Sequence, residues 1–378
     1  MSGGRDVVVL GVGLHPFGRF PERTIDDLAR EAALAALDDA GIAFREVEAG
    51  FLGRVGGSGP PVGVGTRIFA ELGQHGIPIT NVELACGSSS RALMHAADMI
   101  RAGTAETAMV IGVEKMERGM LQVGGPGATN YASIMGLNVM PAAYAMRAQR
   151  HMAEFGTRPE HFAQVSVKSH KNAVHNPNAQ YRIAITLDEV LGSRMVCEPI
   201  TLYQCCPTSD GASAVVLASA AFAKKHTTSP VYLRAWAGGS PVYAGGHEGL
   251  GEGPTSLVAQ RAYERAGIGP EDVRVTQVHD AFTPGEILTI EELGYVKQGE
   301  GGPFVWEGGT EITGKYPVNT DGGLLSRGHP MGATGGAMVT EIVRQLRGQA
   351  GQRQVEHAGT GLVQNAGIGG VNVLVLSR

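Results

Sequence analysis

Short apolar segments alternate with segments of helical spacing at both ends of this chain, and this alternation constrains its fold more than any other feature. Residues 7–10 and 107–113 are apolar runs of strand length, and 24–40 between them repeats apolar side chains at helical spacing. Towards the other end, a helical pattern at 254–266 precedes an apolar run at 273–278. Strands that alternate with helices are typical of α/β proteins. We therefore expect an α/β fold.

The stretch 114–199 lacks this alternation and mixes methionines and histidines with loop residues. We expect an inserted, mostly helical loop domain there, between two similar α/β halves that suggest an internal duplication. The predicted division is 1–113 for the first part of the N-terminal half, 114–199 for the loop domain, 200–218 for the end of the N-terminal half, and 219–378 for the C-terminal half. Four histidines of the loop domain are predicted to lie on its solvated surface: His151, His161, His170 and His175.

Charge and cysteine content argue against several classes of protein. The 378 residues carry a net charge of −5, so no basic surface for nucleic acid is expected. No apolar run is long enough to span a membrane. Four cysteines do not make a disulfide framework in a chain of this length. We expect reduced thiols and a cytoplasmic protein.

Two patterns resemble cofactor or metal sites without meeting their requirements. The glycine pair in 11–13 follows a predicted strand, but Pro16 stands where a dinucleotide-binding loop has its third glycine. Cys205, Cys206 and His226 do not have the spacing of zinc ligands. We therefore predict no bound dinucleotide and no metal.

Cys86 is the first candidate for chemistry. It follows a predicted strand at 81–85 and precedes a predicted helix that ends at Gly103. A helix N-terminus presents free amide groups and a partial positive charge, which favour a thiolate over a thiol. The alternative is a buried and inert cysteine, because free cysteine is among the most buried residue types.

Two histidines are further candidates. His279 lies between the strand at 273–278 and a predicted helix at 283–293, whose start we assign to a capping box of Thr283 and Glu286. His279 could also be a structural histidine bonded to backbone. His329 stands between a glycine and a proline, which predicts an exposed imidazole on a rigid turn. One cysteine and two histidines suffice for acyl transfer, because a thiolate needs a base and a carbonyl needs hydrogen-bond donors.

Four motifs together resemble the thiolase family along the chain from residue 7 to 376. They are the segment 210–217 (DGASAVVL), the glycine pair at 322–323, the segment 328–335 (GHPMGATG) and the segment 364–370 (QNAGIGG). The best match is the sterol-carrier-protein type with its archaeal and bacterial relatives. These proteins carry His-Asp, as this chain does at His279 and Asp280, where other thiolases carry Asn-Glu. The resemblance implies a five-layered αβαβα fold and a homodimer or a dimer of dimers.

The resemblance also implies roles for individual residues. Cys86 would be the acylated nucleophile, and His329 would take its proton and polarise the thioester. His279 would complete a first oxyanion hole, and the amides of Cys86 and Gly367 would form a second. Many thiolases use a second cysteine as acid and base. The two positions where it would stand are occupied by Asn365, next to the substrate site, and by Ala281.

The implied activity is formation or cleavage of a β-ketoacyl thioester of coenzyme A. Coenzyme A and acyl-CoA would be substrates, without a tightly bound cofactor. Retro-aldol cleavage and decarboxylative condensation on the same fold are the enzymatic alternatives. A third hypothesis is a subunit that works only with a small partner carrying a zinc ribbon and an OB fold, as in thiolases that resemble this subgroup.

Overall fold

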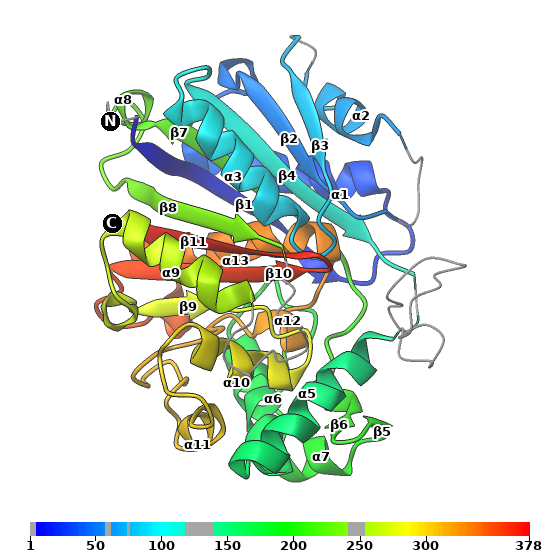
Figure 1. The fold of residues 1–378 in the computed structure, drawn as a ribbon. Helices are drawn as coiled ribbons and strands as arrows, with labels where there is room; N and C mark the ends of the chain where they lie inside the picture. Colours follow the sequence, from blue (N-terminus) through cyan, green and yellow to red (C-terminus); the bar gives the residue numbers. More distant parts are fainter. Residues whose placement is uncertain (1–4, 57–61, 74–75, 118, 120–138, 241–253) are drawn as a thin grey trace.

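A mixed β-sheet of nine strands, with helices on both faces, forms the centre of the computed structural model (Figure 1). The strand order is β3-β2-β4-β7-β1-β8-β11-β10-β9. The structure describes all residues except 1–4, 57–61, 74–75, 118, 120–138 and 241–253. The nine strands are β1 (Val7–Gly18), β2 (Ala49–Gly53), β3 (Ile79–Val82), β4 (Thr107–Lys115), β7 (Asp210–Ser219), β8 (Val231–Gly239), β9 (Val275–Gln277), β10 (Thr360–Gly367) and β11 (Gly370–Ser377).

Helices cover the sheet and form a separate group at one end of it (Figure 1). None of the described helices combines the length and the apolar character needed to cross a bilayer. The helices are α1 (Ile25–Ala40), α2 (Val64–Ala70), α3 (Ser88–Arg101), α5 (Met140–Phe155), α6 (Pro159–Ala173), α7 (Leu187–Gly192), α8 (Ala220–Ala223), α9 (Pro254–Ala266), α10 (Thr283–Glu292), α11 (Gly301–Trp306), α12 (Gly323–Ser326) and α13 (Met331–Arg347).

The sheet consists of two parts that meet at β1 and β8. In the first part β2 runs parallel to β3 and β4, while β7 runs antiparallel to β4 and β1. In the second part β11 runs antiparallel to β8 and β10, and β9 runs parallel to β10. The seam between them is short, because β1 pairs with β8 only at Val7, Val8 and Val9.

The alternation of side chains along β1 explains why helices cover both faces of the first part. Val7 and Val9 belong to one buried cluster, together with side chains of α3 and α13. Val8 and Leu10 belong to another, together with the apolar side of α1. Because successive strand residues point to opposite faces, α1 lies on one face and the α3–α13 pair lies on the other.

The same alternation in β11 shows that the second part of the sheet lies between the α3–α13 pair and α9. Leu374 and Leu376 share the cluster of α3 and α13, whereas Val373 and Val375 pack with α9 in a third cluster. Helix α13 accordingly contacts β4 and β7 of the first part as well as β9 and β10 of the second. The order of layers is α1, first part, α3 with α13, second part, α9. The predicted α/β class and five-layered arrangement are confirmed.

Helix α1 begins and ends where its sequence predicts. The Thr24 hydroxyl accepts a hydrogen bond from the Asp27 amide at 3.1 Å, and the Asp27 carboxylate accepts one from the Thr24 amide. Gly41 ends the helix with φ 64°, a left-handed conformation that glycine adopts without steric cost. The glycines at 11 and 13 bring β1 close to this helix, because a Cβ atom at either position would collide with α1 backbone.

Residues 139–206 form α5, α6 and α7 and a small hairpin of β5 (Met195–Cys197) and β6 (Ile200–Thr201). They pack against α10 and α11 (Figure 1). The prediction of four solvated histidines is wrong for His151, His161 and His170, which are buried, whereas His175 is exposed. These three face neighbouring elements. The clearest example is His151, which makes hydrogen bonds to Thr157 and to Glu291 of α10.

The predicted capping box at the start of α10 is also wrong. The N-cap position is Phe282, without a side-chain capping bond. The Thr283 hydroxyl instead donates to the Gln204 side chain at 2.8 Å. Glu286 forms a buried ion pair with Lys168 of α6. Tertiary partners therefore occupy both side chains that would have closed the box.

Candidate active site

The turn that carries Cys86 is strained and tightly packed. Ala85 has φ 44°, a left-handed value that is uncommon for residues with a side chain, and the Gly87 amide donates to Leu84 O at 2.8 Å. Gly367, at the end of β10, lies against this turn, where a Cβ atom would collide with Leu84 O. The turn places Cys86 just before α3, in the position predicted from the sequence.

His329 accepts a hydrogen bond from the Cys86 thiol in the observed arrangement. Its Nε2 lies 3.1 Å from Cys86 Sγ, and its Nδ1 lies 2.8 Å from the Thr334 hydroxyl. The only proton of that hydroxyl is donated to Pro330 O, so Thr334 accepts from Nδ1–H. His329 therefore carries its proton on Nδ1, and its Nε2 is free to accept the proton of Cys86.

His279 has the opposite tautomer. The Asn365 side-chain amide nitrogen lies 3.1 Å from His279 Nδ1, while the Asn365 carbonyl accepts from the Ser90 hydroxyl at 2.7 Å. An amide nitrogen only donates, so Nδ1 is an acceptor and the ring proton lies on Nε2. The two rings meet edge to face with centroids 5.2 Å apart. His279 thus offers an N–H donor beside the Cys86–His329 pair.

Burial keeps all three groups neutral at rest. It raises the pKa of the Cys86 thiol to about 12, which outweighs the favourable effect of the local backbone amide. Burial and the charge of Arg327 lower the pKa of His279 to about 3. Burial lowers the pKa of His329 well below its usual value, and His279 and Arg327 lower it further. The expectation of a resting thiolate at Cys86 is therefore wrong.

The exposure predicted for the His329 imidazole is wrong too. The residue is fully buried, because the turn at 328–330 lies inside the protein rather than on its surface. Ser209, from the segment before β7, accepts a hydrogen bond from the His329 amide at 2.9 Å. Gly328 has φ 111°, so it adopts a conformation open mainly to glycine.

The three candidate side chains form a compact group. Cys86 Sγ and one ring nitrogen from each of His279 and His329 all lie within 4.8 Å of one another. Sulfur and imidazole nitrogen are also the ligands of zinc. Within the described part of the chain this is the one group of histidine, cysteine or carboxylate side chains with the geometry to hold a metal ion.

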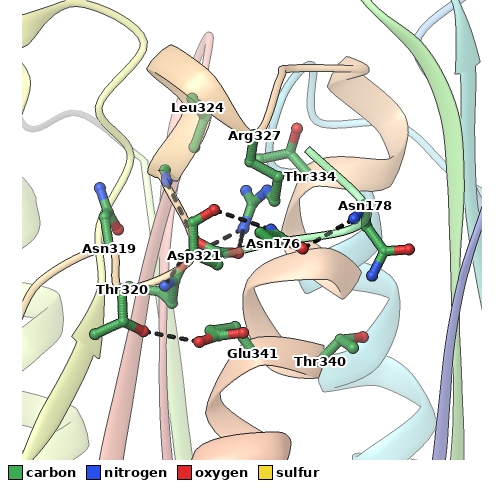
Figure 2. A network of polar contacts seen from close by, with 12 residues as sticks. Asn176, Asn178, Asn319, Thr320, Asp321, Leu324, Arg327, Thr334, Thr340 and Glu341 are labelled. Carbon is green, nitrogen blue, oxygen red and sulfur yellow. Dashed lines mark hydrogen bonds and ion pairs between the residues drawn. The ribbon is translucent and has the colours of Figure 1, made fainter. Parts of the chain in front are cut away.

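A buried polar network supports the turn that leads to His329, as Figure 2 shows. Arg327 forms an ion pair with Asp321, and Gln277 at the end of β9 donates to the same carboxylate at 3.1 Å. Asn176 donates to Asp321 O at 2.9 Å. The network fixes the chain on both sides of α12 and holds a positive charge close to both histidines.

Asn319 connects this network to the segment of His279. Its side-chain carbonyl accepts from the Val278 amide at 2.9 Å, and its amide nitrogen donates to Val278 O at 3.2 Å. Asp280 accepts from the Leu324 amide at 2.7 Å, which ties the residue after His279 to α12. The two histidines are therefore held by one continuous set of contacts.

A cavity of about 260 Å³ reaches His279 from the side of α5 and α10. Gly367 at the end of β10 lies on its wall, so the cavity also borders the turn of Cys86. Its lining mixes apolar and polar side chains, among them Met140, Tyr144, Arg147, Thr289 and Glu292. A cavity of this kind is the form in which proteins bind small molecules.

The structure brings together every site residue predicted from the sequence: Cys86, His279, His329, Asn365 and Gly367. Sequence reasoning missed the residues that set the two tautomers. Thr334 had a weak signal, because it lies one helical turn after Pro330 and therefore beneath His329. Ser90 had none beyond its place one turn after Cys86.

Two family models match the chain. One is described as "Thiolase, N-terminal domain" and matches residues 7–221, and the other as "Thiolase C-terminal domain-like" and matches residues 249–377. The chain belongs to the thiolase family. Its relatives within this family include "Sterol carrier protein 2" of Oryctolagus cuniculus, which is 39% identical over 98% of this chain and 72% of that protein. "Acetyl-CoA acetyltransferase" of Methanothermobacter thermautotrophicus is 38% identical over 96% of each. The recognition made from the four motifs is confirmed.

The chain is also similar to one further relative and to solved structures of other proteins. "Benzoylsuccinyl-CoA thiolase subunit BbsB" of Thauera aromatica is 39% identical over 93% of this chain and 92% of that protein. The solved structure "Ltp2-ChsH2(DUF35) aldolase" superposes with a TM-score of 0.87 at 29% identity, over 99% and 98% of the two chains. Human mitochondrial 3-ketoacyl-CoA thiolase in complex with CoA superposes at 0.77 and 20% identity, over 99% and 98%, and shows the shared fold.

Proposed function

We propose that this thiolase-family chain is an acyl-CoA C-acyltransferase, which forms or cleaves a β-ketoacyl-CoA through an acyl-enzyme at Cys86. The observation that carries this proposal is the 3.1 Å hydrogen bond between Cys86 Sγ and His329 Nε2. It pairs a nucleophile with a base whose proton is held on its other nitrogen by Thr334. A nucleophile, an adjacent base and a group that orients the base are the parts that covalent acyl transfer requires.

The first step in the cleavage direction is attack of Cys86 on the β-carbonyl of the substrate. His329 takes the thiol proton as the sulfur attacks, because neither group is charged at rest. The backbone amides of Cys86 and Gly367 would stabilise the oxyanion, and Gly367 lies directly against the Cys86 turn. The carbon–carbon bond then breaks and leaves an acyl group on sulfur.

The second step requires stabilisation of the enolate that leaves. His279 Nε2–H points a fixed donor into the site, and the newly protonated His329 supplies another. With a pKa of about 3, His279 stays neutral at physiological pH and does not exchange protons there. Donation to the thioester oxygen is therefore the role that its environment supports. Free coenzyme A then attacks the acyl-enzyme as a substrate, so the cycle needs no tightly bound cofactor.

This proposal is tested by thiolysis. The purified chain is incubated with coenzyme A and a series of β-ketoacyl-CoA thioesters of increasing length, and the acyl-CoA products are measured by mass spectrometry. The expected result is a pair of shorter thioesters whose formation needs both coenzyme A and Cys86. Cleavage that proceeds without coenzyme A, or at the same rate in Cys86→Ala, would contradict it.

A second candidate is an aldolase or thiolase subunit that depends on a partner chain. Two observations favour it: the similarity to a structure described as a DUF35 aldolase, and Ala281 and Asn365 at the positions of a second cysteine. The partner would be a small protein with a zinc ribbon and an OB fold. Retro-aldol cleavage needs no nucleophile, so the retained Cys86–His329 pair supports the acyltransferase over the aldolase.

Copurification separates the two candidates. A partner-dependent subunit should be slow or poorly soluble alone. It should recover activity when it is coexpressed with a small zinc-binding protein encoded beside it in the genome. Full thiolysis by the chain alone would exclude it.

In either case we propose a homodimer as the basic unit, with 114–199 as a loop domain that holds coenzyme A. Light scattering of the purified chain tests the dimer.

A further inference from the structure

Cys206 lies directly opposite Ala281 in the structure. Cys205 and Phe282 form an isolated antiparallel bridge, and the Cys206 amide donates to Ala281 O at 2.9 Å. Residues opposite each other in an antiparallel pair present their side chains on the same face, with Cβ atoms about 5 Å apart. A thiol at position 206 therefore occupies nearly the same region as a thiol at position 281 would.

Cys206 lines a cavity and has a pKa that Cys86 influences. The side chain is partly exposed and lines a cavity of about 520 Å³, which Cys205 lines as well. Burial raises the pKa of its thiol well above the usual value, and the effect of a charge on Cys86 comes next. Burial raises the pKa of Tyr144 to about 12, and both Cys86 and Cys206 contribute to the rise. Cys206 is thus a protonated thiol whose pKa responds to the charge of Cys86.

The neighbouring cysteine, Cys205, lies opposite Phe282 instead of Ala281. Cys205 Sγ donates to Thr201 O at 3.4 Å. Burial raises the pKa of its thiol to about 12, and the side chains that further change this pKa are Arg194 and Cys197 rather than Cys86. Both residues lie in the same turn and belong to the same segment before β7. Cys205 is therefore a matched control for any property of Cys206.

We propose that Cys206 is the acid and base at the substrate α-carbon, in place of the thiol that position 281 lacks. This inference rests on the proposed acyltransfer function. In the cleavage direction the bond between the α- and β-carbons breaks and leaves its electron pair on the enolate. The Cys206 S–H bond breaks as its proton forms the new C–H bond. The Cys206 thiolate then takes the proton of the coenzyme A thiol, and the coenzyme A sulfur attacks the thioester at Cys86. No proton is gained or lost over the cycle.

Three variants test this role: Cys206→Ser, Cys205→Ser, and the double variant Ala281→Cys with Cys206→Ser. The measurements are acylation of Cys86 by acyl-CoA, exchange of the substrate α-hydrogens with deuterated water, and thiolysis. Cys206→Ser should keep acylation, which shows that it is folded. It should lose exchange and thiolysis by roughly 100- to 10,000-fold, the usual contribution of a general acid and base. Cys205→Ser should match the wild type.

The double variant is the most informative of the three, because it moves the thiol from position 206 to the opposite position, 281. It should recover most of the lost exchange and thiolysis if the position of the thiol is what matters. Three outcomes would overturn the inference: unchanged turnover in Cys206→Ser, an equal loss in Cys205→Ser, or no recovery in the double variant. Loss of acylation in Cys206→Ser would also overturn it, by showing a structural role. A wild type that neither forms the acyl-enzyme nor cleaves substrate would instead refute the proposed function itself.

Discussion

Cys86 and His329 stand 243 positions apart in the chain and are joined by one hydrogen bond of 3.1 Å. Cys86 comes from the turn before α3, and His329 from the turn before α13, so the two helices of the central layer each place one partner. Because burial raises the pKa of the thiol to about 12 and lowers the pKa of the imidazole, the pair is neutral at rest. Proton transfer therefore accompanies attack instead of preceding it.

The neutral pair predicts the pH dependence of alkylation. Iodoacetamide reacts with thiolate, and with a pKa of about 12 the thiolate fraction of Cys86 grows about tenfold per pH unit through neutral and mildly alkaline pH. The rate at Cys86 should rise throughout that range, and acyl-CoA should protect the residue. Peptide mass spectrometry gives the rate, with Cys86→Ser as the background for the other three cysteines. A plateau from neutral pH upwards would indicate a preformed thiolate–imidazolium pair instead.

Thr334 is expected to control the reactivity of His329 through the tautomer. Thr334→Val keeps the side-chain volume but leaves the buried Nδ1–H without an acceptor, at a cost of about 1–3 kcal/mol. Acylation of Cys86 should slow by roughly 10- to 100-fold as the proton shifts to Nε2. Thr340→Val is the control, because Thr340 is buried in the same helix and its hydroxyl donates to Gly336 O, one turn earlier in that helix. Equal slowing in both variants would show that the effect is structural.

Replacement of His329 and replacement of His279 should impair different steps of the reaction. His329→Ala should slow acylation of Cys86 by acyl-CoA, because it removes the base that bonds to Sγ. His279→Ala should leave acylation largely intact and abolish condensation and thiolysis, because it removes a donor from the enolate. Burst acylation by intact-protein mass spectrometry, measured beside turnover, distinguishes them. Equal loss of acylation would mean that the histidines act as one unit.

The buried ion pair between Lys168 and Glu286 should be important for stability. Lys168→Met leaves a buried carboxyl without its partner and should lower the free energy of unfolding by about 3–5 kcal/mol. Lys171→Met is the control on the same helix, since Lys171 pairs with Glu311 at the surface and should change it by less than about 1 kcal/mol. Urea unfolding compares the two. Similar small changes would show that Glu286 is accommodated without Lys168.

The sequence was sufficient for the fold and for the principal side chains of the site. Helix α1 carries its own start and stop signals at Thr24 and Gly41, so local rules predict it. Cys86 and His279 each follow a strand, and strand ends are where α/β sheets place their sites. Gly367 belonged to a recognisable motif, and the structure shows the collision that requires glycine there.

Partners distant in sequence explain what could not be predicted. Glu286 looked like a capping residue of α10, but Lys168 from another helix binds it, and no local pattern contains that contact. The turn at His329 could be predicted, but its burial depends on how the layers enclose it. The position of Cys206 opposite Ala281 depends on a bridge between segments about 75 residues apart, which only the folded chain reveals.

The mass of the group bound to Cys86 after incubation with acyl-CoA tests the central claim most directly. The chain is incubated with a panel of acyl-CoA thioesters, digested and analysed by peptide mass spectrometry. The account predicts an added acyl mass on the Cys86 peptide, release of one coenzyme A per acyl group, and no adduct in Cys86→Ala. An adduct that persists in Cys86→Ala, or a wild-type Cys86 that no acyl-CoA of the panel acylates, would contradict it.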